Sequence, residues 1–259
     1  MKAEQIKTPE NLREWLQSFP QEGEAERNEL HRLLLGLAQR ASMRVLPHFW
    51  SWGWTDAGRE LSDSALVGLR CTLISQIALH DPDSKIDQFA RPAFKTAQEI
   101  YNLMGTNGQA PLQSVIAGLA SADKSSMTAA IQSAGTAAYM TFALGRDVEI
   151  QNDAAKLTDG HDALSLPLWQ EQIPNQVLTG ERWKEIRDKQ AELGPDWKFW
   201  IEWYENSLHG HSQGTSDQRV RLRRSVSLIA SVAAKRAFGA RFCSFRAAIS
   251  AVLSISGRL

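Results

Sequence analysis

One stretch of this sequence combines the residue types that acid–base catalysis requires. DGHDA, residues 159–163, sets an imidazole among carboxylates: Asp159, His161 and Asp162. Such groups move protons efficiently when a cleft holds them together and shifts their pKa values. The residues around them are polar, so we favour a solvated loop here and assign no catalytic residue.

A second stretch could contribute metal ligands. LHGH, residues 208–211, places His209 and His211 on either side of Gly210. Both imidazoles could reach one ion from an extended turn, but zinc needs at least three protein ligands and the neighbouring sequence suggests no third. We favour a helix end terminated by glycine, and we assign no metal ligand and no cofactor-binding residue.

The elements that must position these residues are expected to be helices. Apolar residues recur at three- and four-residue intervals along most of the chain, and no useful stretch alternates at period two. Thr8 and Pro9 are typical of a helix start, whereas Pro20 and Pro47 predict helix ends. The expected helices cover residues 8–19, 24–46, 57–79, 89–104, 112–120, 124–144, 180–193 and 196–208, with a polar, irregular region between 145 and 164.

This pattern predicts an all-α fold class: a multi-helix, bundle-like domain with an alanine-rich helical core and a tryptophan-rich carboxy-terminal helix. Three regions are expected along the chain. Residues 1–165 form the helical body, residues 166–212 form a Trp-rich helical segment packed on it, and residues 213–259 form a basic tail rich in Ser, Arg and Ala.

The most aromatic stretch is DWKFWIEWYENSL, residues 196–208. On a helical wheel it presents one apolar stripe, and a second apolar edge contains Phe199 and Trp203. The stripe consists of Trp197, Trp200, Ile201, Tyr204 and Leu208. Because full burial of a large aromatic side chain stabilises a fold by roughly 2–3 kcal/mol, we interpret this helix as a packing wedge between two layers. The alternative is that Phe199 and Trp203 form an exposed platform for a partner or a nucleobase.

A related aromatic run, HFWSWGW at residues 48–54, follows Pro47. It is expected to be a turn that tucks its indoles under the helices, and a binding rim at Trp50 and Trp52 is the alternative. The candidate interaction surface therefore consists of Phe199, Trp203, Trp50 and Trp52.

The segment from Pro167 to Gly210 carries a longer pattern: PLW, a proline, a tryptophan, then WxxWIxWY and LxG. The residues that match it are Pro167, Leu168, Trp169, Pro174, Trp183, Trp197, Trp200, Ile201, Trp203, Tyr204, Leu208 and Gly210. Together with RLLLGLAQRASMRVLPHFW upstream, this pattern resembles a family of uncharacterised bacterial α-helical proteins over residues 28–210. The resemblance implies an α-helical domain and brings no catalytic residues with it. The chain departs from the pattern after Gly210, where no acidic, apolar segment follows.

The charge of the chain is divided sharply along its length. Residues 218–259 contain nine of the 29 basic residues and none of the 29 acidic ones, which leaves 20 basic residues against 29 acidic residues before them. The candidate basic patch consists of Arg219, Arg221, Arg223 and Arg224. Such a patch could neutralise nucleic-acid phosphates, and amphipathic spacing in the tail could suit an anionic membrane surface. The tail could instead dock on the acidic body, or it could be a frameshift product that is not native-like.

Composition narrows the functional class. The chain is 43% apolar and 22% charged, as folded soluble proteins are, and it has no apolar run long enough for a transmembrane helix or typical of a signal peptide. We therefore expect a cytoplasmic protein, in which Cys71 and Cys243 are reduced, buried thiols. We predict a non-enzymatic helical module that works through contacts with an unknown protein partner, in an accessory or regulatory role. The alternative is a nucleic-acid binder that uses residues 218–259, and the third possibility is an enzyme of unidentified class.

Overall fold

The structure is a computed structural model. It describes residues 1–53, 55, 64–80, 87–104, 106–123, 125–169, 180–192 and 196–210. These residues form a short 3-10 helix, Ala3–Gln5, and nine α-helices, and they contain no β-strand, so the all-α prediction is confirmed. The α-helices are α1 (Pro9–Gln17), α2 (Glu24–Gly53), α4 (Ser64–His80), α5 (Asp87–Leu103), α6 (Thr106–Ala120), α7 (Met127–Ala143), α8 (Asp147–Thr158), α9 (Gly180–Glu192) and α10 (Asp196–Leu208).

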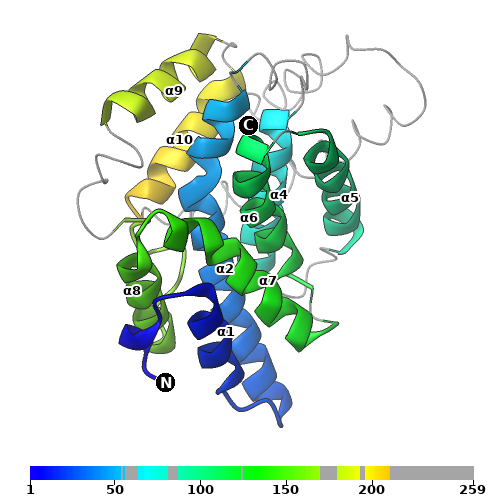
Figure 1. Cartoon of the computed structure of the whole chain (residues 1–259), viewed down its shortest axis with the longest axis vertical. Helices are drawn as coiled ribbons and strands as arrows, with labels where there is room; N and C mark the ends of the chain where they lie inside the picture. The colour runs from blue at the N-terminus through cyan, green and yellow to red at the C-terminus, as the bar shows by residue number, and fades with distance from the viewer. Residues whose placement is uncertain are drawn as a thin grey trace, which may run out of the picture.

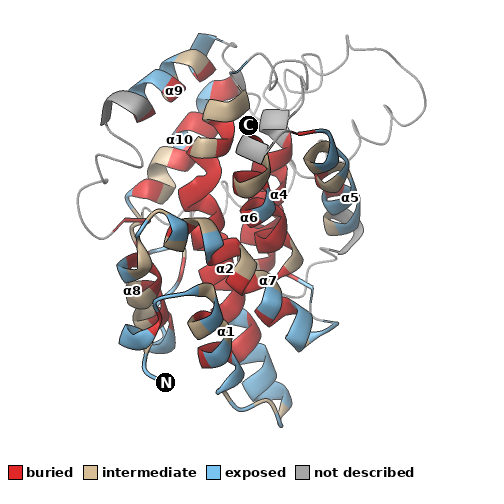
Figure 2. Cartoon of the chain, viewed as in Figure 1, coloured by how far each residue is buried: buried red, intermediate tan, exposed pale blue. Residues whose placement is uncertain are grey.

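The long helix α2 is the centre of the arrangement. It packs against α4, α6, α7 and α8, while α5 packs on α4 and α6. In Figure 1, α1 and α8 lie toward one end of α2, and α9 and α10 lie toward the other. Most of α2 is buried, as the red ribbon in Figure 2 shows, so the other helices are organised around it.

The apolar interior is divided into two clusters. The first cluster contains residues from α1, the first half of α2, α7 and α8, among them Leu12, Leu34, Ala134 and Ile150. The second cluster contains residues from the second half of α2, from α4, α5 and α6, and from the Trp-rich segment, among them Phe49, Leu73, Val115 and Trp203. Helix α2 therefore contributes to both clusters and connects them.

The amino-terminal helix forms as its sequence predicts. Pro9 is the first residue of α1, and the backbone N–H of Asn11 donates to Thr8 Oγ1 at 3.2 Å. This bond satisfies one of the amide groups that a helix start leaves without an intrahelical acceptor. Helix α1 ends at Gln17, three residues before Pro20.

Two expected helix boundaries are wrong because tertiary burial overrides proline. Helix α2 continues through Pro47 to Gly53, so residues 48–53 are helical and do not form the expected turn. A proline inside a helix removes one hydrogen bond and crowds the preceding turn. Phe49 and Trp50, which follow Pro47, are 0% and 1% exposed, and their burial favours continuing the helix. Helix α6 likewise begins at Thr106 and runs through Pro111, earlier than residue 112.

Helix α8 occupies a region that was expected to be irregular. Its sequence does carry the necessary signals: Asp147 and Glu149 lie in the positively polarised first turn, and Ile150, Ala154 and Leu157 share a buried face. The high polarity of the region concealed this spacing. The correction has a structural consequence, because α8 buries two carboxylates, Glu149 and Asp153.

Candidate functional site

Two arginines on α2 meet two carboxylates on α8 inside the protein. Arg40 and Arg44 are one helical turn apart, as are Glu149 and Asp153, and all four side chains are at most 2% exposed. Arg40 Nε lies 2.9 Å from Asp153 Oδ1, and Arg44 Nη1 lies 2.6 Å from Asp153 Oδ2. The Arg40 contact is a charge contact rather than an aligned hydrogen bond, whereas the Arg44 contact is both. We call these four residues the ionic junction.

The ionic junction also holds a segment without regular secondary structure. This segment, residues 163–169, is named the strap; it follows α8 in the chain and lies against α2. Arg40 donates to three strap carbonyl oxygens and Arg44 donates twice to a fourth. The acceptors are Ala163 O and Leu166 O at 2.9 Å, Pro167 O at 2.6 Å, and Leu168 O at 2.8 and 2.9 Å. Carbonyl groups that lack helix or sheet partners are thereby satisfied.

The strap continues directly into the packing of α10. Leu168 N donates to Leu208 O at 3.1 Å, at the end of that helix. Gly210 follows with φ +65°, and a Cβ atom there would lie 2.4 Å from Pro167 N, so only glycine fits this contact. The strap contributes Leu166 to the first apolar cluster and Leu168 to the second, which places the ionic junction at the boundary between the two.

Trp169 covers the charged groups at the end of the strap. The guanidinium carbon of Arg44 lies 5.5 Å from the indole centroid, and that of Arg146 lies 5.8 Å from it. Arg146 also pairs with Glu149 at 2.9 Å. Cation–π contacts of this kind add stability where the cation has little access to water.

The electrostatics of the ionic junction favour a structural role. Burial lowers the pKa of Arg40, and the charge of Asp153 partly offsets that effect. Every guanidinium nitrogen of Arg40 and Arg44 already contacts a carboxylate or a carbonyl oxygen. An incoming anion would therefore have to break existing bonds, and a buried pair that loses one partner is destabilised by about 3–5 kcal/mol.

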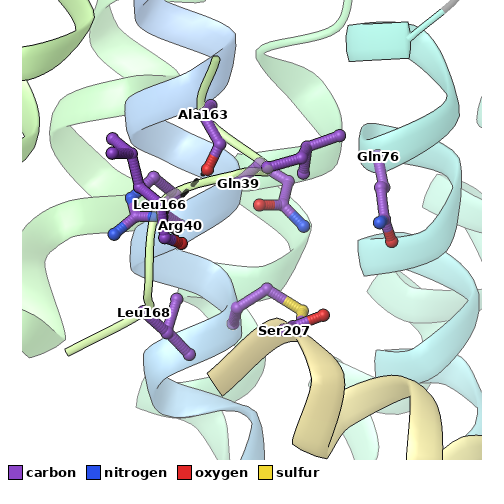
Figure 3. A pocket seen from close by; sticks show the side chains of 9 residues that line it. Gln39, Arg40, Gln76, Ala163, Leu166, Leu168 and Ser207 are labelled. Carbon is purple, nitrogen blue, oxygen red and sulfur yellow. Dashed lines mark hydrogen bonds between the residues drawn. The ribbon is translucent and has the colours of Figure 1, made fainter. Parts of the chain in front are cut away.

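A small polar cavity adjoins the ionic junction. It has a volume of about 20 Å³ and is lined by side chains that include Gln39, Arg40, Gln76 and Ser207. Figure 3 shows Gln39 on α2 and Gln76 on α4 at facing sides of the space, with the strap passing beside it. Since a water molecule needs at least about 10–15 Å³, this cavity has room for ordered water but not for a metabolite.

A second cavity of about 60 Å³ lies next to the start of the strap, lined by residues that include Arg32, Leu157 and Asp162.

The Trp-rich segment is packed as a wedge. Trp197, Trp200, Ile201, Tyr204 and Leu208 are all buried, as the helical wheel predicts. The ring of Tyr204 contacts two indoles that also stack on each other, with its centroid 5.2 Å from Trp50 and 4.8 Å from Trp183. Its hydroxyl donates to Met43 O at 3.2 Å, and burial raises the pKa of this phenol well above its usual range.

Two residues of the candidate interaction surface lie in the core. Trp50 is 1% exposed and Trp203 is 2% exposed, and Trp203 Nε1 donates to Gln76 Oε1 at 2.9 Å. The exposed-platform alternative is therefore wrong for Trp203, and the binding-rim alternative is wrong for Trp50. Trp52 is half-buried and stacks on Phe49 with centroids 6.1 Å apart. The side chain of Phe199 lies outside the described part of the structure, as does the basic patch at Arg219, Arg221, Arg223 and Arg224.

The candidate chemical groups are not assembled into a site. Asp159, His161 and Asp162 are exposed in the loop after α8, as favoured from sequence. His209 is exposed beyond α10, and His211 lies outside the described residues. Within the ranges that the structure describes, no three potential ligands of the Asp, Glu, His or Cys type come close enough to hold a metal. Cys71 is a buried free thiol, as expected, and Cys243 lies outside those ranges.

Sequence reasoning missed the ionic junction, although its signal was present. Arg40 and Arg44 lie beside Leu37 and Ala41, inside the apolar stripe of α2, where a solvated arginine is not expected. Two buried arginines four residues apart require acceptors from another element. The pair Glu149 and Asp153, also four residues apart, had the matching spacing.

Comparisons with known proteins do not assign this chain to a family. No protein-family model, curated protein or solved structure matches the chain. The resemblance over residues 28–210 therefore stays a prediction. None of the described helices is long and apolar enough to span a membrane. The fold and the ionic junction define an all-α helical protein whose two apolar clusters are joined by buried charge.

Proposed function

We propose that this protein is a helical protein-interaction module, cytoplasmic and accessory in role, that binds its partner through the outer face of α7. The observation that carries the proposal is the chemistry of that face. Helix α7 has 17 residues, none of them charged, and its inner side packs against α1, α2 and α6. The outer side is open to solvent, and Figure 2 shows exposed residues along it.

The exposed residues of α7 form a narrow, neutral stripe. They are Thr128, Ala129, Gln132, Tyr139 and Ala143. Tyr139 is 57% exposed, and Val148, which follows the turn into α8, is 55% exposed. Over 16 residues the stripe extends about 24 Å along the helix axis.

Surface helices usually carry charged residues on the face that meets water. A face without charges loses little hydration when another surface covers it, because no ion has to be desolvated. Tyrosine is enriched at protein interfaces, since its ring buries a large area and its hydroxyl keeps a polar contact. The stripe on α7 thus shares with interface cores the absence of charged residues, and Tyr139 is its aromatic anchor.

Site-specific photo-crosslinking tests this proposal. A photoreactive phenylalanine analogue placed at Tyr139, in cells that express the full chain, is expected to give a discrete product with one partner. Excess unlabelled protein should compete with its formation, and Gln132→Lys should abolish it. The matched control is the same analogue at Lys198, whose side chain is 78% exposed on α10. Equal products from both positions, or none from Tyr139, would refute the α7 interface.

The alternative function, nucleic-acid binding, rests on the charge of residues 218–259. If it is correct, the full chain retains duplex DNA at 50 mM salt, and about tenfold or more affinity is lost by 200 mM salt because counterions are released. Simultaneous substitution of the four basic-patch arginines by alanine is expected to flatten this salt dependence. Salt-independent or undetectable binding excludes this function.

A further inference from the structure

Helix α4 contains a buried arginine whose surroundings differ from those of the ionic junction. Every residue from Val67 to Ala78 is buried, so this part of α4 is enclosed. Within it, Arg70 is 5% exposed. A buried N–H group needs an acceptor, because an unsatisfied one leaves the cost of its desolvation uncompensated.

The described part of the chain does not provide those acceptors. Two of the three guanidinium nitrogens of Arg70, Nε and Nη2, are shielded from solvent and have no hydrogen-bond acceptor among the described residues, whereas Nη1 is not one of the shielded atoms. No carboxylate of those residues forms an ion pair with Arg70, whereas Arg40 and Arg44 are paired on every nitrogen. Burial lowers the pKa of Arg70.

The position of Arg70 on α4 directs it away from α2. Gly68 faces α2 closely, since a Cβ atom there would lie 2.7 Å from the Phe49 ring. Arg70 follows two residues later, about 200° further around the helix axis. Its neighbours on this side of α4 are Leu73, Ile74 and Ile77, all apolar and buried.

A guanidinium in such a place keeps its charge, because arginine does not deprotonate in the physiological range even when its pKa falls. An unpaired buried charge is strongly destabilising. The same dry surroundings strengthen the attraction to an opposite charge that enters them. The planar fork of N–H donors fits two oxygens of one oxyanion.

We propose that Arg70 anchors a binding site for an oxyanion, the phosphate or carboxylate group of a small molecule. The apolar side chains along this side of α4 exclude water from the pair, and the guanidinium supplies charge and bidentate hydrogen bonds. This site is separate from the ionic junction, where every guanidinium nitrogen already lies against Asp153 or a strap carbonyl oxygen. It is also independent of the α7 interface, so either proposal can fail without the other.

Thermal unfolding of the full chain at constant ionic strength tests the site. Inorganic phosphate in one series and acetate in another replace chloride. At least one of them is expected to raise Tm with a saturating dose dependence, as a ligand of the native state does. Phosphate alone indicates a phosphorylated ligand, and acetate alone indicates a carboxylate. The variant Arg70→Met should lose the response.

The sign of the Arg70→Met effect distinguishes an external anion from an internal partner. In chloride buffer the variant is expected to unfold at the same temperature as the wild type or higher, because it removes an unpaired buried charge. A lower Tm in chloride would mean that an acid elsewhere in the chain already pairs with Arg70, which overturns the proposal. Arg187→Met, at an arginine whose side chain is 41% exposed, is the control that should keep the anion response.

Anion binding can also be measured directly, so that the test does not depend on the unfolding temperature of Arg70→Met. Isothermal titration of wild-type protein with the anion that raises Tm should give a saturable heat. Arg70→Lys, which keeps the charge and loses the fork, is expected to weaken this binding about tenfold. No saturable heat, or equal affinity in the lysine variant, contradicts the site.

Discussion

The buried arginines of α2 and the buried arginine of α4 lie in the same helical body but have different surroundings. Arg40 and Arg44 meet two carboxylates and four strap carbonyl oxygens. Arg70 is buried too, but its Nε and Nη2 have no acceptor among the described residues. Burial opposes the charge of Arg40 and of Arg70 alike, but Asp153 compensates only Arg40. A buried arginine can therefore stabilise the fold or bind a ligand, depending on whether the chain itself supplies acceptors for its N–H groups.

Where the acceptors belong to the chain itself, the charge stabilises one arrangement of helices. The ionic junction joins α2 to α8 and fixes the strap, and the strap in turn contacts the end of α10. Where the described acceptors are missing, we infer that the charge is kept for a ligand. This difference can be tested by removing partners one at a time.

The largest effect is expected from Asp153→Ala. The substitution leaves two buried guanidinium groups without their shared carboxylate, so the free energy of unfolding should fall by about 3–5 kcal/mol. Urea denaturation followed by circular dichroism measures this change. Asp159→Ala, at an exposed aspartate after α8, is the control and should stay within about 0.5 kcal/mol of wild type. A similar small effect for both variants would show that the ionic junction does not hold the fold.

A smaller effect is expected where the strap meets the end of α10. Gly210→Ala adds a Cβ atom against Pro167 N and also requires φ +65° from alanine. Gly160, with φ +85° and open space around it, provides a matched control for the backbone cost alone. That cost is about 1–3 kcal/mol, and Gly210→Ala should exceed Gly160→Ala by at least about 1 kcal/mol. Equal losses in urea denaturation would mean that the strap moves away easily.

At the edge of the ionic junction, the loss should be smaller still. Arg146 pairs with Glu149 but has a side chain that is 27% exposed, so water screens the interaction. Arg146→Met is therefore expected to cost about 1–2 kcal/mol, less than Asp153→Ala. A cost equal to that of Asp153→Ala would place the centre of the ionic junction at Glu149 and contradict the geometry.

The smallest effect is expected at Cys71, the thiol next to Arg70. Burial raises the pKa of Cys71 from 9.0 to about 12. Because the folded pKa is the higher one, the contribution of Cys71 to stability is complete below pH 9.0 and is lost as pH rises toward 12. In a Cys243→Ser background at pH 8, a thiol reagent should label native protein at least about 100-fold more slowly than urea-unfolded protein. Equal rates would show that this part of α4 is open, which would also remove the basis of the Arg70 site.

Several local features could be read from the sequence because they depend on neighbours in the chain. The cap at Thr8, the apolar stripe of α10 and the glycine at position 210 are decided by residues within one or two turns of each other. The spacing left Trp203 open between a wedge and an exposed platform, and its burial against Gln76 decided for the wedge. In contrast, the continuation of α2 through Pro47 depends on how well Phe49 and Trp50 are buried by other helices.

By itself, the sequence determined most of the helices and the apolar stripe of α10, since these depend on spacing at 3.6 residues per turn. Only the tertiary structure decided which charges meet. Glu149 and Asp153 lie more than 100 residues after Arg40 and Arg44, and pairing across that separation depends on how α2 and α8 pack. The same packing leaves Arg70 without a described partner. Electrostatic interactions inside a protein depend on the distance between the charges and on their burial, and neither can be obtained from the order of the residues alone.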